Sequence, residues 1–137
     1  MKALTLLRPW SNAIIRFGKD VENRTWAPAS VILGQRIAIH SGREIDPRGV
    51  GFVMALLRGD KLASAMHTDD LLGPPMSIIG TVKLVGVVRQ SSSQWFSGPI
   101  GWQLADPRPL REPLFCRGMQ RLWTVPPEIE EIIRESL

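Results

Sequence analysis

RPWSNAIIRFGKDVENRTW, residues 8–26, places a helical pattern directly before a cluster of charged residues. Its apolar residues recur at the i, i+3, i+4, i+7 spacing of an amphipathic helix; they are Trp10, Ala13, Ile14 and Phe17. Pro9 suits the first turn of such a helix, and Gly18 is typical of a helix end. We therefore expect a helix over residues 10–17, followed at once by a polar segment.

The polar segment has the alternation of a short strand over residues 22–26 (ENRTW). Alternation directs Glu22, Arg24 and Trp26 to one face, and Lys19 ends the preceding turn. Arginine contacts phosphates and base edges, glutamate accepts from exocyclic amines, and an indole ring stacks on bases. The segment therefore predicts a site for a flipped or single-stranded base. The alternative is an ordinary surface ion pair with Trp26 covering the core.

Five further segments have the composition of strands, namely residues 2–7, 34–42, 77–89, 101–110 and 121–126. Residues 77–89 give the strongest signal because they are rich in β-branched side chains. Gly80 and Gly86 inside that segment indicate bends or bulges. Pro107 and Pro109 are expected to end the strand that contains them.

Helical patterns also occupy residues 48–58 and the segment from Pro127 to residue 137. Short strands separated by turns, with only two or three helices, predict an α+β fold built on a small, strongly bent sheet or barrel. A parallel βαβ architecture fits this pattern poorly. The length of 137 residues suits one domain, residues 1–137.

The composition favours a globular protein with a basic surface. The chain is 44% hydrophobic and 22% charged, with 17 Lys and Arg against 13 Asp and Glu. Thirteen of the 17 cations are arginine, whose planar fork suits phosphate, so nucleic acid or a phosphorylated ligand is a plausible partner. No apolar run reaches the roughly 20 residues that cross a membrane.

The location is predicted from the first residues and the cysteine content of the chain. Arg8 and Pro9 interrupt the apolar start, so no secretory signal is expected. Cys116 is the only cysteine and cannot form an internal disulfide, which favours a reducing compartment, the cytoplasm. Two histidines and scattered acids make a metal site improbable, and we expect no metal and no cofactor.

The chain resembles the ASCH domain (activating signal cointegrator homology), a branch of the PUA-like superfamily. The resemblance begins with the aromatic helix and the K-x-x-E-x-R pattern within residues 8–26. GQRIAIHSG, SIIGTVKLVGVV and GPIGWQLADPRPL with LWTVP are similar to later strands of the family, so nearly the whole chain is covered. The resemblance implies a small β-barrel of about five to six strands, flanked by two to three helices.

The resemblance also implies a basic cleft between the barrel and the first helix. In related PUA-like domains this cleft receives RNA or a modified nucleobase, so the expected partner is RNA, a nucleotide or a modified nucleoside. The binding positions of the family map onto Trp10, Lys19, Glu22, Arg24, Trp26, His40 and Ser41.

The same cleft has an enzymatic alternative. Some small bacterial ASCH proteins resemble amidohydrolases that remove an acyl group from N4 of cytidine, with a lysine as base for a threonine three residues later. This chain has Lys19 at the lysine position but Glu22 at that of the threonine. Glu22 would have to activate a water molecule, although neighbouring cations weaken it as a base. A ribonuclease would instead use Lys19, Arg24 and His40, so catalysis stays open.

Other aromatic and cationic residues have two interpretations each. Trp95 and Phe96 lie in a serine-rich segment and either stack on bases or fill the mouth of the barrel. Trp102 and Trp123 are expected in the core, with closure of the cleft as the alternative for Trp102. Four late arginines form either a phosphate track or a solvated rim; they are Arg108, Arg111, Arg117 and Arg121.

Overall fold

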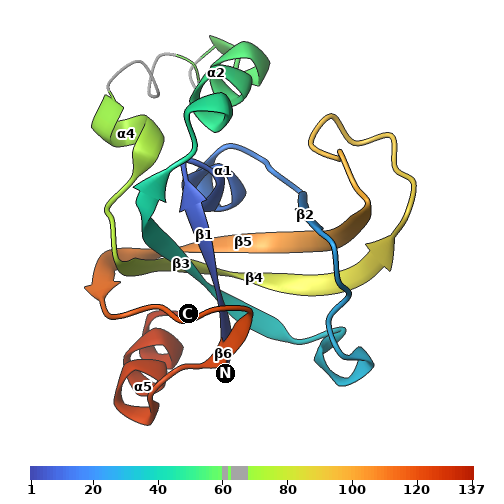
Figure 1. Cartoon of the computed structure of the whole chain (residues 1–137). Coiled ribbons are helices and arrows are strands. Elements are labelled where there is room, and N and C mark those ends of the chain that lie inside the picture. The colour runs from blue at the N-terminus through green and yellow to red at the C-terminus, as the bar shows by residue number, and fades with distance from the viewer. Residues whose placement is uncertain (60–61, 63–67) are drawn as a thin grey trace.

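A strongly bent, six-stranded sheet organises the computed structural model, which describes residues 1–59, 62 and 68–137 (Figure 1). The strand order is β2–β5–β4–β3–β1–β6. Only β1 and β3 pair in parallel, and the other neighbouring pairs are antiparallel. The strands are β1 (Lys2–Arg8), β2 (Val21–Arg24), β3 (Arg36–Ile45), β4 (Ser77–Val88), β5 (Ile100–Phe115) and β6 (Leu122–Thr124).

Helices cover both faces of this sheet, so the expected α+β fold is confirmed. The α1 helix packs on the sheet, with α2 and α4 beyond it, and α5 lies near β6 (Figure 1). Within the described residues, no helix combines the length and the apolar character that a membrane crossing needs. The helices are α1 (Trp10–Arg16), the 3-10 helix η1 (Ser30–Ile32), α2 (Pro47–Leu56), α4 (Thr68–Leu72) and α5 (Pro127–Ser136).

Alternation along β1 and β3 separates two cores. Leu4 and Ile39 are paired and face the α1 side, where Trp102 is completely buried. Ala3 and Ala38 are paired and face the other side, toward α5. The small alanine side chains let Trp123 of β6 and Ile133 of α5 pack closely against the sheet.

The sheet is open rather than a closed barrel. β2 and β6 are its two edges, and no backbone ladder joins them in the described part of the chain. Two arginine side chains span the gap instead. Arg24 Nη2 donates to the carbonyl of Thr5 on β1 at 3.4 Å, and the guanidinium of Arg121 lies 3.9 Å from the centre of the Trp26 ring.

The expected end of the strand over residues 101–110 is wrong, because β5 continues through Pro107 and Pro109 to Phe115. The pairing of β5 with β4 shifts register three times along its length. A proline lacks an N–H group and is tolerated where such irregularities leave a donor unneeded. Asp106, with a φ of 51°, marks one of these irregularities.

Candidate functional site

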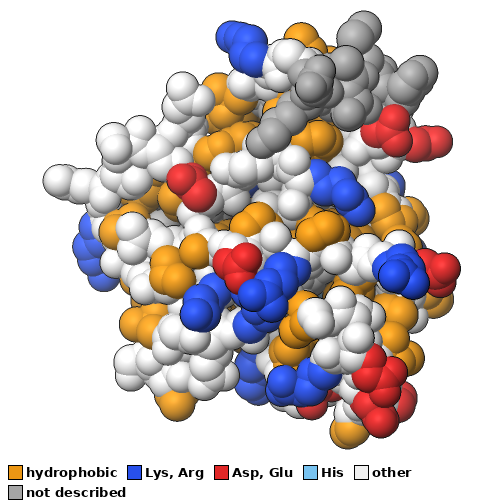
Figure 2. All heavy atoms as spheres, turned by 180° about the vertical axis from the view of Figure 1, so that it is seen from behind, with side chains coloured by type: hydrophobic (Ala, Val, Ile, Leu, Met, Phe, Trp, Pro, Cys, Tyr) orange, Lys and Arg blue, Asp and Glu red, His pale blue; other side chains and the backbone are white. Residues whose placement is uncertain are grey.

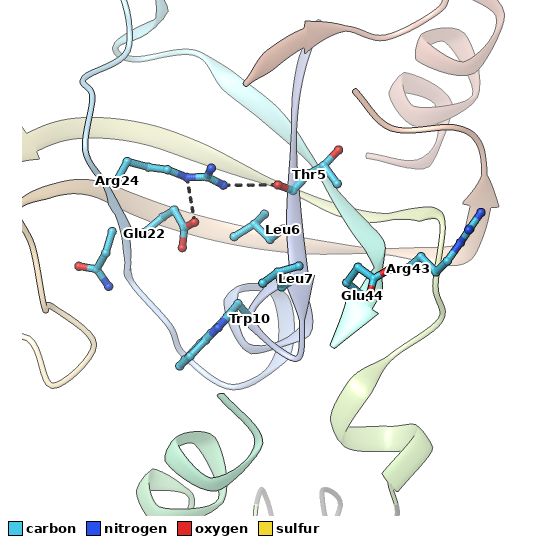
Figure 3. Close-up of a pocket in the computed structure, with 9 residues that line it drawn as sticks. Thr5, Leu6, Leu7, Trp10, Glu22, Arg24, Arg43 and Glu44 are labelled. Atoms are coloured by element: carbon cyan, nitrogen blue, oxygen red, sulfur yellow. Dashed lines mark hydrogen bonds and ion pairs between the residues drawn. The ribbon is translucent and has the colours of Figure 1, made fainter. Parts of the chain in front are cut away.

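Two adjoining hollows lie between the ends of β1 and β2, on the side covered by α2. Both have volumes in the range of small-ligand sites. They share Trp10, Glu22 and Asn23, so they form one divided cleft. The strand hollow, of about 330 Å³, is lined by Thr5, Leu6, Leu7, Trp10, Glu22, Asn23, Arg24, Arg43 and Glu44 (Figure 3). The aromatic hollow, of about 430 Å³, is lined by Trp10, Lys19, Glu22, Asn23, Asp46, Arg48, Phe52, Gln94, Trp95, Phe96 and Ser97.

A buried carboxylate between two cations forms the wall where the hollows meet. Lys19 Nζ donates to Glu22 Oε1 at 2.8 Å. Arg24 Nε donates to Glu22 Oε2 at 3.1 Å (Figure 3). Lys19 also donates to the carbonyl of Val21. Lys19 is 3% exposed and Glu22 is 8% exposed. Because an unpaired charge at this depth would be strongly unfavourable, each of these groups holds the others in place.

Local backbone geometry brings these three side chains together. Gly18, with a φ of 80°, turns the chain directly after α1, and the amide of Lys19 donates to the carbonyl of Ala13 at 3.1 Å. The ammonium is therefore directed back along the helix toward β2. Glu22 and Arg24 then point to the same side because they are two residues apart in a strand that pairs with β5.

Asp46 joins the first helix to the second. Its Oδ2 accepts a hydrogen bond from Trp10 Nε1 at 3.0 Å, and its Oδ1 caps α2 by accepting from the amide of Arg48 at 3.0 Å. The indole hydrogen bond is the largest cause that lowers the pKa of Asp46, so the residue stays ionised at neutral pH. The Trp10 ring is thereby fixed, and its centre lies 5.6 Å from Lys19 Nζ, within range of a cation–π contact.

A serine-rich loop supplies the far wall of the aromatic hollow. Asn23 holds this loop: its Nδ2 donates to the carbonyl of Trp95 at 2.9 Å, and its Oδ1 accepts from the amides of Ser97 and Gly98 at 2.9 and 3.0 Å. Trp95 consequently stands 5.9 Å from Phe52, ring centre to ring centre. Phe52 in turn stands 5.8 Å from Trp10, so three of the four aromatic rings that line the hollow stand in a row.

Charges around the cleft nearly balance. Four cationic side chains and three carboxylates line the two hollows, which leaves one excess positive charge. Attraction of a long polyanion into the cleft is therefore weak, and stacking and hydrogen bonding have the larger part in what it can bind. The cations are Lys19, Arg24, Arg43 and Arg48, and the carboxylates are Glu22, Glu44 and Asp46.

Comparison with solved structures decides the fold. A crystal structure titled ASCH from Zymomonas mobilis matches this chain with a TM-score of 0.58 and 19% sequence identity, over 98% of this chain and 93% of that one. The fold is the ASCH fold. Two crystal structures of single-residue mutants of that Zymomonas mobilis protein match with TM-scores of 0.56 and 0.54 and identities of 19% and 20%. They cover 99% and 98% of this chain, and 96% of each of theirs.

Sequence similarity is much weaker than structural similarity. No protein-family model matches the chain, and no curated protein matches it. The ASCH resemblance that the sequence suggested is thus confirmed for the fold, by the shape of nearly the whole chain.

Of the seven residues expected at the site, the ASCH fold brings four together at the cleft. These are Trp10, Lys19, Glu22 and Arg24. Trp26 lies elsewhere and lines neither hollow. Its ring meets Trp102 edge-on at 4.8 Å between centres, and Arg121 covers it.

His40 and Ser41 are buried and also line neither hollow. His40 faces the α5 side of the sheet, where its Nδ1 lies 3.2 Å from Thr5 Oγ1 and its Nε2 lies 2.8 Å from the carbonyl of Cys116. Ser41 accepts a hydrogen bond from Ser11 Oγ at 3.0 Å beneath α1. Both positions belong to a strand that is covered on its two faces, which explains why neither reaches the cleft.

Several lining residues were missed by sequence reasoning. Asp46 followed by Pro47 is a typical N-cap and first-turn pair. This pair predicts a helix that begins at Pro47, as α2 does, rather than at residue 48. Phe52 gave no signal beyond an apolar helix, because its place in the cleft depends on how α2 packs on α1. Within the described residues, no group of three or more His, Cys, Asp or Glu side chains is arranged to hold a metal ion.

Proposed function

We propose that this protein binds RNA or a nucleotide-like ligand by taking a single base into the aromatic hollow. The observation that supports the proposal is the meeting of three aromatic rings with the buried Lys19–Glu22 pair on one hollow of about 430 Å³. Rings of this kind stack on any base. An ammonium and a carboxylate side by side suit a base edge that carries an acceptor beside a donor.

The hydrogen-bonding capacity of the pair supports this proposal. A lysine ammonium has three N–H donors, and Lys19 uses two of them, on Val21 and Glu22. Each carboxylate oxygen accepts up to two hydrogen bonds, and each oxygen of Glu22 accepts one from a cation. One donor and two acceptor positions therefore remain for a ligand.

Binding is preferred to hydrolysis because of how Glu22 is held. Removal of an acyl group from N4 of cytidine, or cleavage of RNA, would need a free base in the cleft. A proton on Glu22 would neutralise the carboxylate, and the buried ammonium of Lys19 and the partly buried guanidinium of Arg24 would then lose their counter-charge. Incubation with N4-acetylcytidine and with short RNA, followed by chromatography, tests this preference, because any product that depends on Lys19 would overturn it.

The binding test compares two phenylalanines. Phe52 lines the aromatic hollow, whereas Phe115 is 80% exposed at the end of β5 and lines neither hollow. Loss of one base–aromatic stack weakens binding by about 1–3 kcal/mol, or roughly 5- to 150-fold. We expect Phe52→Ala to lower the affinity for cytidine, N4-acetylcytidine or a 12-nucleotide single-stranded RNA by that factor, measured by calorimetry. Phe115→Ala should leave it unchanged.

Two results would overturn the proposal. One is the absence of any binding of these nucleosides and of RNA at millimolar concentration. The other is an equal effect of the two phenylalanine variants, which would place the ligand outside the aromatic hollow.

A further inference from the structure

A second charged surface lies away from the cleft, on three neighbouring strands of the sheet. Arg36 of β3 is directly opposite Lys83 of β4, and Arg108 of β5 is opposite Thr81, two residues along β4. Directly paired residues share a face of the sheet, so the three cations lie on one face. Figure 2 views the molecule from behind and shows Lys and Arg side chains gathered around an Asp or Glu near the middle of that side.

One carboxylate serves the two arginines of this cluster. Asp106 Oδ2 accepts from Arg108 Nη2 at 2.9 Å and also from Arg36 Nη2. Arg36 is anchored further, since its Nη1 donates to Thr81 Oγ1 at 3.0 Å and to the carbonyl of Asp106 at 2.9 Å. No ion pair in the described part of the chain involves Lys83. The cluster therefore carries two excess positive charges.

The arrangement works against folding stability in two respects. Like charges directly opposite each other on a sheet are destabilising, as Arg36 and Lys83 are. Asp106 adopts a φ of 51°, a left-handed conformation that is unfavourable for a residue other than glycine. Strain and charge repulsion gathered at one place are typical of binding surfaces rather than of structural ion pairs.

We propose that this face, formed by Lys83 and Arg108 with Arg36 behind them, contacts the phosphates of single-stranded RNA. Arg108 is half exposed and Lys83 is exposed, so both can reach a ligand, whereas Arg36 is anchored and mainly holds Asp106. A guanidinium matches two oxygens of a phosphate, and an ammonium adds a mobile point charge. The proposal rests on the proposed function only in the choice of RNA as the polyanion. It adds to the cleft a surface that a free nucleoside would not use.

The cleft and this face bind through different interactions. The cleft has almost no excess charge and selects through stacking, whereas the face has no aromatic ring among its members and attracts through charge. Binding to the face must therefore weaken as salt increases, because each neutralised phosphate of a single strand contributes about 0.7 to the slope of log affinity against log salt concentration.

The test measures this slope. A fluorescent 12-nucleotide single-stranded RNA is titrated by anisotropy between 50 and 200 mM KCl with the wild type, with Lys83→Gln/Arg108→Gln and with Arg16→Gln/Arg134→Gln. The two double variants lose the same net charge, but Arg16 and Arg134 lie on α1 and α5. We expect the first variant to reduce the slope by about 1.4 and the affinity at 0.1 M salt by ~10-fold or more. The control should change both much less.

The outcomes separate this proposal from the function of the cleft. Equal slopes for the two double variants, or no RNA binding by the wild type, would overturn the phosphate surface. Both sites are supported if Phe52→Ala loses nucleoside binding with an unchanged salt slope and Lys83→Gln/Arg108→Gln reduces that slope. A reduced slope in Lys83→Gln/Arg108→Gln, together with no nucleoside binding by the wild type, would overturn the cleft alone. Thermal unfolding checks the fold, which should be retained because Lys83→Gln relieves a like-charge pair.

Discussion

Among single residues, Asn23 decides where the aromatic wall of the cleft stands. Its neighbours Glu22 and Arg24 face the charged wall, while its own amide holds three backbone groups of the loop around Trp95. One strand of four residues thus positions both sides of the aromatic hollow. The serine-rich loop becomes part of the site because its backbone polar groups find partners on Asn23, and Ser93 Oγ holds it further by donating to Asp20 Oδ1.

The state of His40 also follows from its partners. Trp123 Nε1 donates to Thr5 Oγ1 at 3.0 Å, so the Thr5 hydroxyl is free to donate to His40 Nδ1. The proton of the ring then lies on Nε2, where it is donated to the carbonyl of Cys116. Burial lowers the pKa of His40 below the ordinary value of 6.5, although the bond to Cys116 opposes the shift, so the ring is neutral at neutral pH.

This neutral histidine predicts a pH dependence of stability. Below about pH 6.5 the unfolded chain takes up a proton at residue 40 and the folded protein does not, so the free energy of unfolding falls as pH falls. The contribution of one such histidine is at most about 1.4 kcal/mol per pH unit, between the unfolded and the folded pKa, and vanishes above pH 6.5. Urea unfolding of wild type and His40→Gln at several pH values measures it. If the free energy of unfolding changed equally with pH in the two proteins, His40 would not be the source of the pH dependence.

At the scale of elements, contact between α2 and α1 gives the cleft its depth. Asp46 both caps α2 and holds the Trp10 ring, and Gly49 lets the helix backbone approach that ring. A Cβ atom at Gly49 would lie 2.8 Å from Trp10 Cε2. Two glycines make α2 unfavourable as an isolated helix. Gly49 is nevertheless suited to its position, because it permits the close approach to Trp10.

The two glycines of α2 give a matched pair of substitutions. Gly51 has no atom within 4 Å of its added Cβ, so Gly51→Ala should stabilise the protein by about 0.5–1 kcal/mol through helix propensity alone. Gly49→Ala gains the same propensity but pushes against Trp10, and forcing extra volume into a packed site destabilises by about 1–3 kcal/mol. Denaturant unfolding should therefore show a higher free energy of unfolding for Gly51→Ala and a lower one for Gly49→Ala. Stabilisation by both alanines would show that Trp10 is free to move.

For the molecule as a whole, two arginine side chains span the opening between the edge strands β2 and β6, which no backbone ladder joins in the described residues. The edge strand β2 reaches β1 through Arg24, and the turn after β2 reaches the start of β6 through Arg121 on Trp26. The closed barrel expected from the sequence is therefore not formed: the sheet stays open, and side chains rather than a hydrogen-bonded ladder span its opening. Because the strand hollow lies beside the Arg24 bridge, the opening of the sheet is also where the cleft forms.

These bridges predict graded losses of stability. Arg24→Gln removes a charged partner of the buried Glu22 and should lower the free energy of unfolding by about 1–3 kcal/mol. Arg121→Gln removes a more exposed cation–π contact, worth about 0.5–1 kcal/mol. Arg134→Gln is the control, since its surface pair with Glu130 is worth about 0.5 kcal/mol or less. A loss in Arg24→Gln no larger than in the control would contradict the closing role.

By itself, the sequence determined the helix that follows Pro9 and most strands, because periodicity and turn residues act over short distances. The ASCH fold was indicated by resemblance to that family and not by periodicity. It also brought Lys19, Glu22 and Arg24 together, since all three lie within one short segment. Only the tertiary structure decided that His40, Ser41 and Trp26 lie outside the cleft and that Phe52 and Trp95 line it. It also decided that β5 continues past Pro107 and Pro109. Those outcomes depend on which distant strand or helix packs against each residue, and no local pattern records that choice.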